Sequence, residues 1–338
     1  MTSRTIAELS GVSQTTVSRV MRGDPYVSAA TREKVLRVLR QTGYAPSAAA
    51  RTMRTGSTGI IGVVVGYVTN TFYPELALAL HAEISRRGRR MNLWIADESA
   101  GHEAGERAAL TAVRERAVDG VVFTTVTSGS VALKEALERS APVVLLNRTL
   151  DGIPADSVAT DNAAGAEDVA AYFLAHGRRR IALIAGAREV STSCEREDAF
   201  RAALREAGTP LGDEAVARCD FAYEGGRGAM TDLLQRCPDV DAVFCVNDLI
   251  AFGALDALRG RVPDEVWVVG FDGTTTAGWD AFSLTTVRQP IEQMAAVGID
   301  FLLQRTEQGD GDGDGYRHER LRGELIVRAS TDRESPRS

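Results

Sequence analysis

The stretch that decides the fold stands at the start of the chain, where residues 2–23 read Thr-Ser-Arg-Thr-Ile-Ala-Glu-Leu-Ser-Gly-Val-Ser-Gln-Thr-Thr-Val-Ser-Arg-Val-Met-Arg-Gly. The spacing of the apolar residues predicts two short helices joined by a tight turn at Gly11. Ile6 and Leu9 are expected to point the same way from the first helix. The pattern is that of a helix-turn-helix.

The second helix of this pair has a surface suited to the major groove of DNA. Ser13 is a suitable N-cap for it, and Val17 and Val20 form an apolar stripe for which core packing is the simplest role. Small polar side chains and a cation make up the rest of its surface: Gln14, Thr15, Thr16, Ser18 and Arg19. Amides and hydroxyls can meet base edges there while the arginine meets phosphate.

A third helix is predicted over residues 29–41, with Ser28 as its cap and Gly43 at its end. Its inner face is expected to hold Val35, Leu36, Val38 and Leu39. Three helices in about 45 residues make a small headpiece with a thin core, marginally stable on its own.

The net charge of −7 hides an uneven distribution along the 338 residues. Residues 1–57 hold nine lysines and arginines against three aspartates and glutamates, so 9 − 3 = +6 and −13 remains for the rest. A basic head on an acidic body is expected when only the head touches DNA. A basic surface that merely faces solvent is the alternative, which the helix-turn-helix pattern disfavours.

The cysteine spacing, the lack of an apparent secretory leader and the sequence of one acidic loop together predict a cytoplasmic protein without a metal site. Cys194, Cys219, Cys237 and Cys245 show no metal-ligand spacing, which favours reduced thiols. No secretory leader or membrane-spanning apolar run is apparent, so we expect a cytoplasmic location. Residues 309–315, Gly-Asp-Gly-Asp-Gly-Asp-Gly, fit half of a calcium loop, but position twelve is leucine, which favours a flexible acidic surface loop.

Between headpiece and body, residues 46–56 read Pro-Ser-Ala-Ala-Ala-Arg-Thr-Met-Arg-Thr-Gly. Pro46 suits the first position of a helix and Gly56 ends it, but the helix is too short to be stable alone. The segment is either a plain linker or a helix that forms only when something binds.

From Gly59 onward, short and wholly apolar runs alternate with amphipathic helical stretches. Runs of this kind imply strands buried on both faces, and therefore parallel sheets covered by helices. Their number suits two lobes with a cleft between them, where ligands bind beyond the carboxyl ends of the strands. The runs are 60–65, 93–95, 121–123, 143–146, 181–184, 243–245 and 266–269.

Several phrases resemble the LacI/GalR family of bacterial transcription regulators, over nearly the whole chain. In the headpiece they are Gly11-Val12-Ser13, Thr16-Val17-Ser18-Arg19-Val20, Val27-Ser28, Thr31-Arg32, Val35 and Gly43-Tyr44-Ala45-Pro46. In the body they are Asn147-Arg148, Asp161-Asn162, Val246-Asn247-Asp248, Val269-Gly270-Phe271-Asp272 and Leu284-Thr285-Thr286-Val287-Arg288-Gln289-Pro290.

The resemblance implies an α/β fold, with a three-helix headpiece before a two-lobed core like that of periplasmic binding proteins. The headpiece would span 1–45, the hinge 46–57, the core 58–332 and a tail 333–338. The N-lobe would take about 58–160 and 291–320, and the C-lobe about 161–290 and 321–332. The tail from Ala329 has no heptad leucines, so a dimer is expected rather than a coiled-coil tetramer.

For DNA, the resemblance implies that the dimer places two headpieces on a near-palindromic operator. Gln14 and Thr15 would read bases, whereas phosphate would be met by Ser13, Thr16, Ser18, Arg19, Ser28 and Thr31. The family's hinge helix forms on the operator and inserts an apolar residue into the minor groove. By position that residue is Met53, where the family usually has Leu, with Ala50 and Arg51 beside it; a plain linker remains the alternative.

For the effector, the resemblance implies a set of cleft residues: Phe72, Tyr73, Asn147, Asp161, Thr192, Arg196, Phe221, Asn247, Asp272 and Gln289. Aromatic faces can stack on a sugar or base ring while amides and charges bind hydroxyls. Core packing is the alternative for the three aromatic residues, and Trp279 is evenly balanced. Cys194 stands where relatives often have Arg.

These features predict a ligand-responsive, DNA-binding transcription regulator, with repression as the family's usual mode. The expected effector is a sugar, sugar phosphate or nucleoside-like molecule. A solute-binding protein of a sugar transport system would share the two lobes, but it would have no use for the basic headpiece and would need a secretory leader. No Walker, strand-linked GxGxxG, nucleophile-elbow or metal motif is present, so we expect no enzyme, catalytic residue, cofactor or metal.

Overall fold

The structure is a computed structural model that describes residues 1–44, 56–96, 103–127, 129–150, 152–308 and 315–332. The chain divides into two compact units, Met1–Thr58 and Gly59–Ser338. Within the described residues, no helix is long and apolar enough to cross a membrane.

The first unit contains α1 (Ser3–Ser10), α2 (Gln14–Met21) and α3 (Ala29–Thr42). The three predicted helices are present, and α3 ends at Thr42, one residue after its predicted end. The Ser13 hydroxyl accepts a hydrogen bond from the backbone N–H of Thr16 at 3.0 Å, which caps α2. Gly11 and Gly43 end α1 and α3 in the left-handed region that glycine adopts without strain.

The headpiece core is small, and two of the predicted core residues are outside it. The core consists of Ile6, Ala7, Val17, Val20 and Val35, so the two valines of α2 pack inward as predicted. The prediction was wrong for Leu9 and Leu36, which are 58% and 38% exposed. At 100° per residue, each lies about 100° from the centre of its helix's buried face.

The second unit is built on two six-stranded sheets, with the strand orders β11-β5-β4-β3-β1-β2 and β12-β10-β9-β8-β6-β7. The first comprises β1 (Ile60–Val65), β2 (Arg90–Ile95), β3 (Gly120–Phe123), β4 (Val143–Leu146), β5 (Asp156–Thr160) and β11 (His318–Leu321). The second comprises β6 (Ile181–Ala185), β7 (Val216–Arg218), β8 (Ala242–Cys245), β9 (Trp267–Asp272), β10 (Thr285–Arg288) and β12 (Glu324–Ile326). All neighbouring strands are parallel except β10 and β12.

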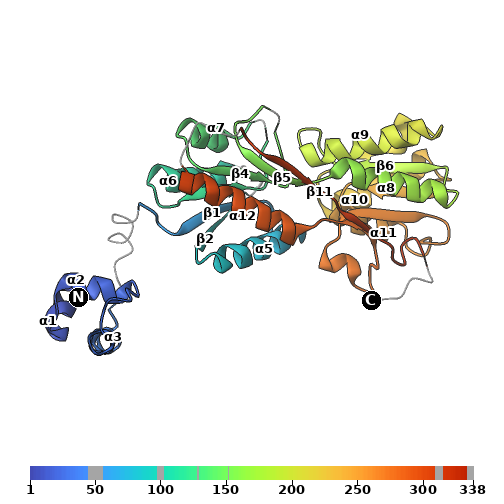
Figure 1. The fold of residues 1–338 in the computed structure, drawn as a ribbon. Helices are drawn as coiled ribbons and strands as arrows, with labels where there is room; N and C mark the ends of the chain where they lie inside the picture. Colours follow the sequence, from blue (N-terminus) through green and yellow to red (C-terminus); the bar gives the residue numbers. More distant parts are fainter. Residues whose placement is uncertain (45–55, 97–102, 128, 151, 309–314, 333–338) are drawn as a thin grey trace. The chain divides into compact units, whose positions relative to one another are not determined.

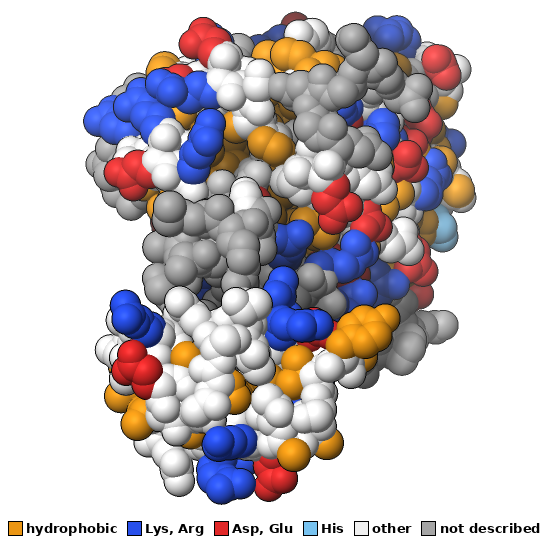
Figure 2. All heavy atoms as spheres, turned by 60° about the vertical axis from the view of Figure 1, so that its left-hand side comes forward, with side chains coloured by type: hydrophobic (Ala, Val, Ile, Leu, Met, Phe, Trp, Pro, Cys, Tyr) orange, Lys and Arg blue, Asp and Glu red, His pale blue; other side chains and the backbone are white. Residues whose placement is uncertain are grey.

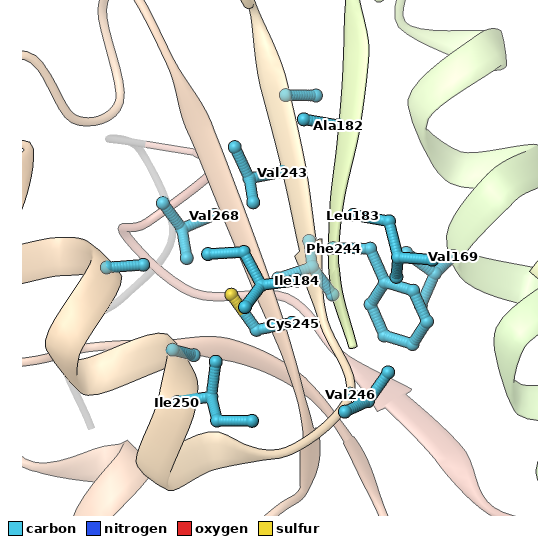
Figure 3. Packing of buried hydrophobic residues seen from close by; sticks show 14 of the residues in the cluster. Val169, Ala182, Leu183, Ile184, Val243, Phe244, Cys245, Val246, Ile250 and Val268 are labelled. Atoms are coloured by element: carbon cyan, nitrogen blue, oxygen red, sulfur yellow. The ribbon is translucent and has the colours of Figure 1, made fainter. Parts of the chain in front are cut away.

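Helices cover both faces of each sheet, as the apolar strands require. In the first lobe, α5 (Phe72–Arg86) and α12 (Ile291–Gln308) pack on one face, and α6 (Glu103–Arg114) and α7 (Val131–Glu138) on the other. In the second lobe, α8 (Asn162–Ala175) and α9 (Ser191–Glu206) lie together, as do α10 (Tyr223–Arg236) and α11 (Asp248–Ala257) (Figure 1). The apolar core of this lobe surrounds β6 and β8 (Figure 3).

All seven predicted apolar runs lie in strands, but one of them is not buried. β2 is the last strand of its sheet, and its side chains Leu93 and Ile95 are each 42% exposed. An edge strand is covered less completely than a central one, so an apolar run does not require burial on both faces there. Figure 2 shows other apolar side chains scattered among basic and acidic ones on the molecular surface.

A buried carboxylate joins three elements of the first lobe. Asp156 in β5 accepts hydrogen bonds from the Arg305 guanidinium of α12 at 3.0 and 3.1 Å. The backbone N–H of Arg317, just before β11, donates to the same carboxylate at 2.8 Å. Burial alone would raise the pKa of Asp156, but the hydrogen bonds from the two arginines outweigh it and lower the pKa to about 2.

We therefore expect Asp156→Asn to lower the unfolding free energy by roughly 3 kcal/mol at pH 7, because it leaves two arginines around an uncharged group. The native pKa lies below the unfolded value, so this stabilisation is present above about pH 4 and is lost as the pH falls toward 2. Urea unfolding between pH 3 and 7 measures the effect. Glu224→Gln, which opens the exposed pair with Arg227, is the control and should change little.

Candidate functional site

The two lobes are joined by three chain crossings, and a cavity lies beside them at the carboxyl ends of the strands. The crossings run from β5 to α8, from β10 to α12 and from β11 to β12. The cavity is lined from both lobes by Tyr67, Asn70, Phe72, Tyr73, Asn147, Arg148, Thr192, Arg196, Phe221, Asn247 and Asp272. Residues that follow parallel strands meet at this edge, which is where open α/β sheets bind ligands.

Arg196 is the central charged group of the cavity, although it is only 3% exposed. Its Nε donates to Asn162 Oδ1 at 2.8 Å, and its Nη1 donates to the Val246 carbonyl at 2.6 Å and to Asp272 Oδ1 at 3.4 Å. The guanidinium also lies 3.6 Å from the ring centroid of Phe271. Together these partners fix the orientation of the cation.

Asp272 ends β9 in a backbone conformation that is rare for a residue with a side chain. Its φ is +127°, and the next residue, Gly273, has a φ of +68°. Asn147, which follows β4 in the other lobe, also has a positive φ of +74°. Strained backbone at the ends of buried strands is typical of sites where side-chain direction matters. Both side chains line the cavity.

A second buried carboxylate, Asp248, lies near Asp272 and is held by threonines. Asp248, at the start of α11, accepts hydrogen bonds from the Thr274 backbone N–H at 2.8 Å, from the Thr274 hydroxyl at 2.9 Å and from the Thr286 hydroxyl. Gly270 makes room for it, because a Cβ there would lie 2.5 Å from Asp248 Oδ1. The close approach of α11 to β9 and β10 therefore requires this glycine.

Among the described residues, Arg196 pairs with Asp272 only, but the charges of Arg196, Asp272 and Asp248 influence one another. Burial raises the pKa of Asp272 to about 7, with Asp248 adding to the rise and Arg196 opposing it. Burial also raises the pKa of Asp248 to about 6, against the hydrogen bonds of Thr286 and Thr274.

The aromatic residues of the predicted site pack into or against the core and also line the cavity. Phe72 and Tyr73 begin α5, pack edge to face with ring centroids 5.4 Å apart, and are buried in the core of the first lobe. They also line the cavity, so the alternatives of core packing and ligand contact are both compatible with their positions. Phe221 approaches Gly186 so closely that a Cβ there would lie 2.3 Å from its ring.

Eight of the ten predicted effector residues meet at the cavity, and Asp161 and Gln289 do not line it. Asp161 instead caps α8, where its carboxylate accepts a hydrogen bond from the Ala164 backbone N–H at 3.0 Å. Trp279 is 57% exposed and also lies outside the lining. The Cys194 thiol donates to the Arg188 carbonyl and is not a lining residue either.

Gln289 acts as a bridge behind the cavity. Its Nε2 donates to Asp272 Oδ1 at 2.7 Å, and its Oε1 accepts from the Thr160 hydroxyl at 2.6 Å. Thr160 ends β5 at the first crossing, and Gln289 itself stands in the second. One buried amide therefore connects a cavity carboxylate to two of the three connections between the lobes.

Three lining residues were missed by the sequence prediction: Tyr67, Asn70 and Arg148. Tyr67 and Asn70 lie in the turn between β1 and α5, where the Asn70 side chain accepts from the Phe72 backbone N–H at 3.1 Å. Arg148 belongs to the phrase Asn147-Arg148 that follows β4. The signal for all three was their position after a buried strand.

Contacts between the lobes flank the cavity. The Thr149 backbone N–H donates to the Ser191 hydroxyl at 3.2 Å, and the Thr275 backbone N–H donates to Glu75 at 2.9 Å. Arg320 of β11 pairs with Glu195 of α9 at 2.9 Å. The free space in the cavity is about 20 Å³, room for about one water molecule. A sugar-sized molecule needs more room than this, and loosening of these contacts would supply it.

In the headpiece, several residues predicted to contact DNA bind each other. The Ser13 and Thr16 hydroxyls lie 2.8 Å apart, as do those of Ser28 and Thr31, at the amino ends of α2 and α3. Further, the Gln14 amide donates to the Ser3 hydroxyl at 2.7 Å, and Arg19 Nε lies 2.8 Å from Asp24. Thr15 is exposed and Ser18 partly so. The predicted hinge contacts Ala50, Arg51 and Met53 lie outside the described residues, as do 309–314 of the acidic loop.

The raised pKa of Asp272 yields a test by pH. The folded protein keeps the Asp272 proton at pH values where the unfolded chain has already lost it. The unfolding free energy therefore falls as the pH rises from about 4, the unfolded pKa, to about 7, the folded pKa. We expect Asp272→Asn to gain melting temperature relative to the parent protein as the pH is raised from 5 to 8. Ligand-free thermal unfolding measures this, and parallel profiles for the two proteins would contradict it.

Comparison with known proteins agrees with both units. Residues 4–47 match the model of "Bacterial regulatory proteins, lacI family", and residues 58–306 that of "Periplasmic binding proteins and sugar binding domain of LacI family". The regulator CelR of Thermobifida fusca is 35% identical over 89% of this chain and 90% of its own, and the ribose operon repressor of Halalkalibacterium halodurans is 33% identical over 98% and 97%. These relatives are regulators rather than enzymes.

Solved structures give the same result. A CelR–cellobiose complex aligns with a TM-score of 0.73 at 33% identity, covering 98% of this chain and 99% of that one. The lac repressor dimer bound to operator and an anti-inducer aligns with a TM-score of 0.84 over the same shares, and at 24% identity it supports the fold alone. The chain belongs to the LacI family of bacterial regulatory proteins.

Proposed function

We propose that this transcription regulator binds a near-palindromic operator as a dimer and senses a small sugar-like or nucleoside-like effector in the interlobe cavity. The observation that carries the proposal is the buried Arg196–Asp272 pair, which lines a cavity formed by both lobes and is tied to the chain crossings by Gln289. Such a site can convert occupancy into a change between the lobes.

The proposed division of labour follows the chain. Residues 1–45 would bind DNA, 46–57 would form a hinge on the operator with Met53 in the minor groove, and 58–332 would sense the effector. Repression is the proposed mode, in a cytoplasmic setting. The relatives whose names or titles mention ribose, cellobiose and an operator support this choice by analogy.

The proposed coupling runs through one amide. Gln289 contacts Asp272 on one side and Thr160 on the other. A ligand that forms a hydrogen bond with Asp272 would therefore change the hydrogen bonding of two chain crossings. Replacing the amide changes no residue of the cavity lining and removes the hydrogen bonds to Asp272 and Thr160.

We therefore expect Gln289→Leu to bind the effector within about tenfold of the parent protein but to lose most of the effector's influence on operator affinity. Asp272→Ala is the matched comparison and should lose effector binding itself while still binding operator. Calorimetry and fluorescence anisotropy on a fragment of the protein's own promoter, with a panel of sugars and nucleosides, separate the two defects. Normal regulation in both variants would contradict the assignment.

The headpiece proposal is tested by salt. Arg19 donates to Asp24 through Nε, and this hydrogen bond lowers the pKa of the Asp24 carboxyl. We expect Arg19→Ala to weaken binding to operator and to unrelated DNA alike. The salt slope should fall by about 0.9 for each DNA phosphate that the missing guanidinium would have neutralised.

Asp24→Asn is the matched control for that variant. It removes the ion pair but keeps the Arg19 cation, so DNA affinity should stay equal or rise. An unchanged salt slope in Arg19→Ala would rule out the phosphate contact. Failure of the parent protein to shift the promoter fragment would favour the alternative, a solute-binding protein for sugar transport.

A further inference from the structure

We propose that the effector is anionic: a sugar bearing a phosphate or carboxylate group that Arg148 binds. This inference rests on the proposed effector role of the cavity and specifies its ligand class. It is carried by a buried cation in the cavity lining, Arg148, most of whose hydrogen-bonding capacity the described residues leave unused.

Arg148 is only 6% exposed, yet the protein provides little to pair with it. Among the described residues, no acceptor contacts its buried Nε. Its Nη1 lies 3.5 Å from the Thr125 carbonyl, at the limit for a hydrogen bond. Within the same part of the chain, no carboxylate forms an ion pair with it. A buried guanidinium normally has partners, because leaving it unpaired costs several kcal/mol.

Comparison with Arg196 shows what a satisfied arginine looks like in this cavity. Arg196 is held by an amide oxygen, a backbone carbonyl and the Asp272 carboxylate. Arg148 follows β4 of the first lobe, directly after Asn147, and contributes to the same lining. Its missing partner therefore corresponds to something that occupies the cavity.

The charge balance of the lining favours an anion. Its charged residues are Arg148, Arg196 and Asp272; the charge of Arg196 is opposed by Asp272 in the lining and by Asp248 behind it, so Arg148 is the cation that no carboxylate of the described residues pairs with. Burial raises the pKa of Asp272 to about 7, which makes the lining still more positive below neutral pH. A neutral sugar would leave this excess charge buried, whereas a phosphate or carboxylate can accept two parallel hydrogen bonds from a guanidinium.

The remaining lining suits the sugar to which the anion is attached. Asn70, Asn147 and Asn247 offer amide donors and acceptors, and Tyr67 and Tyr73 add hydroxyls and aromatic faces. Because Arg148 and Arg196 come from different lobes, an anion held by the first and hydroxyls held by the second would connect them. The ligand would then strengthen the closed arrangement.

The test uses the full-length protein and paired probes. Glucose 6-phosphate, ribose 5-phosphate and glucuronate are compared with glucose, ribose and adenosine by calorimetry, and inorganic phosphate is compared with chloride at matched ionic strength. We expect at least one anionic sugar to bind about tenfold or more tightly than its neutral parent. Binding of the two sugar phosphates would identify a phosphate as the anion, and binding of glucuronate would identify a carboxylate.

Arg148→Gln should abolish the preference for the anion and the response to inorganic phosphate, while the ligand-free melting temperature stays equal or rises. Arg148→Lys keeps a positive charge and should retain part of the preference. Arg259→Gln removes a highly exposed arginine beyond α11 and is the control. Operator binding by every variant verifies folding.

Two results would overturn the inference, and only the second of them would also contradict the proposed function. If neutral sugars or adenosine bind as well as the anions, and Arg148→Gln changes neither, the ligand is neutral and the effector site stands. If no probe binds or alters operator affinity, the anionic ligand is rejected and the proposed effector role of the cavity loses its support as well.

Discussion

The interaction on which the sensing core depends is the enclosure of the Arg196 guanidinium against Asp272 and the Phe271 ring. A buried cation is tolerated only where carboxylate, carbonyl and amide oxygens replace its water, and Asn162, Val246 and Asp272 supply them. These partners come from α8, the end of β8 and the end of β9. The second lobe must therefore fold completely before the cation is satisfied.

Around the cavity, some side chains stabilise the fold, whereas others are arranged for a ligand. Arg196 and Asp248 are surrounded by protein partners and hold the carboxyl ends of the strands together. Arg148, Asp272 and Asn147 instead carry an unmet hydrogen bond or a strained backbone. Costs of this kind accumulate at binding sites, since the groups are arranged for a ligand rather than for the empty protein.

The sequence was sufficient for those parts of the fold that local pattern specifies. Apolar runs predicted seven strands, and Ser13, Ser28 and Gly43 marked helix ends, because caps and turns act over a few residues. Five strands were missed, because they are short, contain polar residues and form only through their neighbours in the sheets: β5, β7, β10, β11 and β12. In the cavity, Arg148 stood in a recognised phrase without a role, because burial of a charged residue is decided by distant segments. Gln289 was assigned to the ligand for the same reason, although it lies one layer behind.

The small volume of the cavity has a consequence for timing. A sugar-sized occupant needs more room than the cavity offers, and separation of the Thr149–Ser191, Glu75–Thr275 and Arg320–Glu195 contacts would supply it on arrival and on departure. Exchange with solvent then depends on how often the lobes part, and an occupant that connects the lobes makes their parting rarer. A regulator built this way averages over brief fluctuations in concentration and responds to supplies that last.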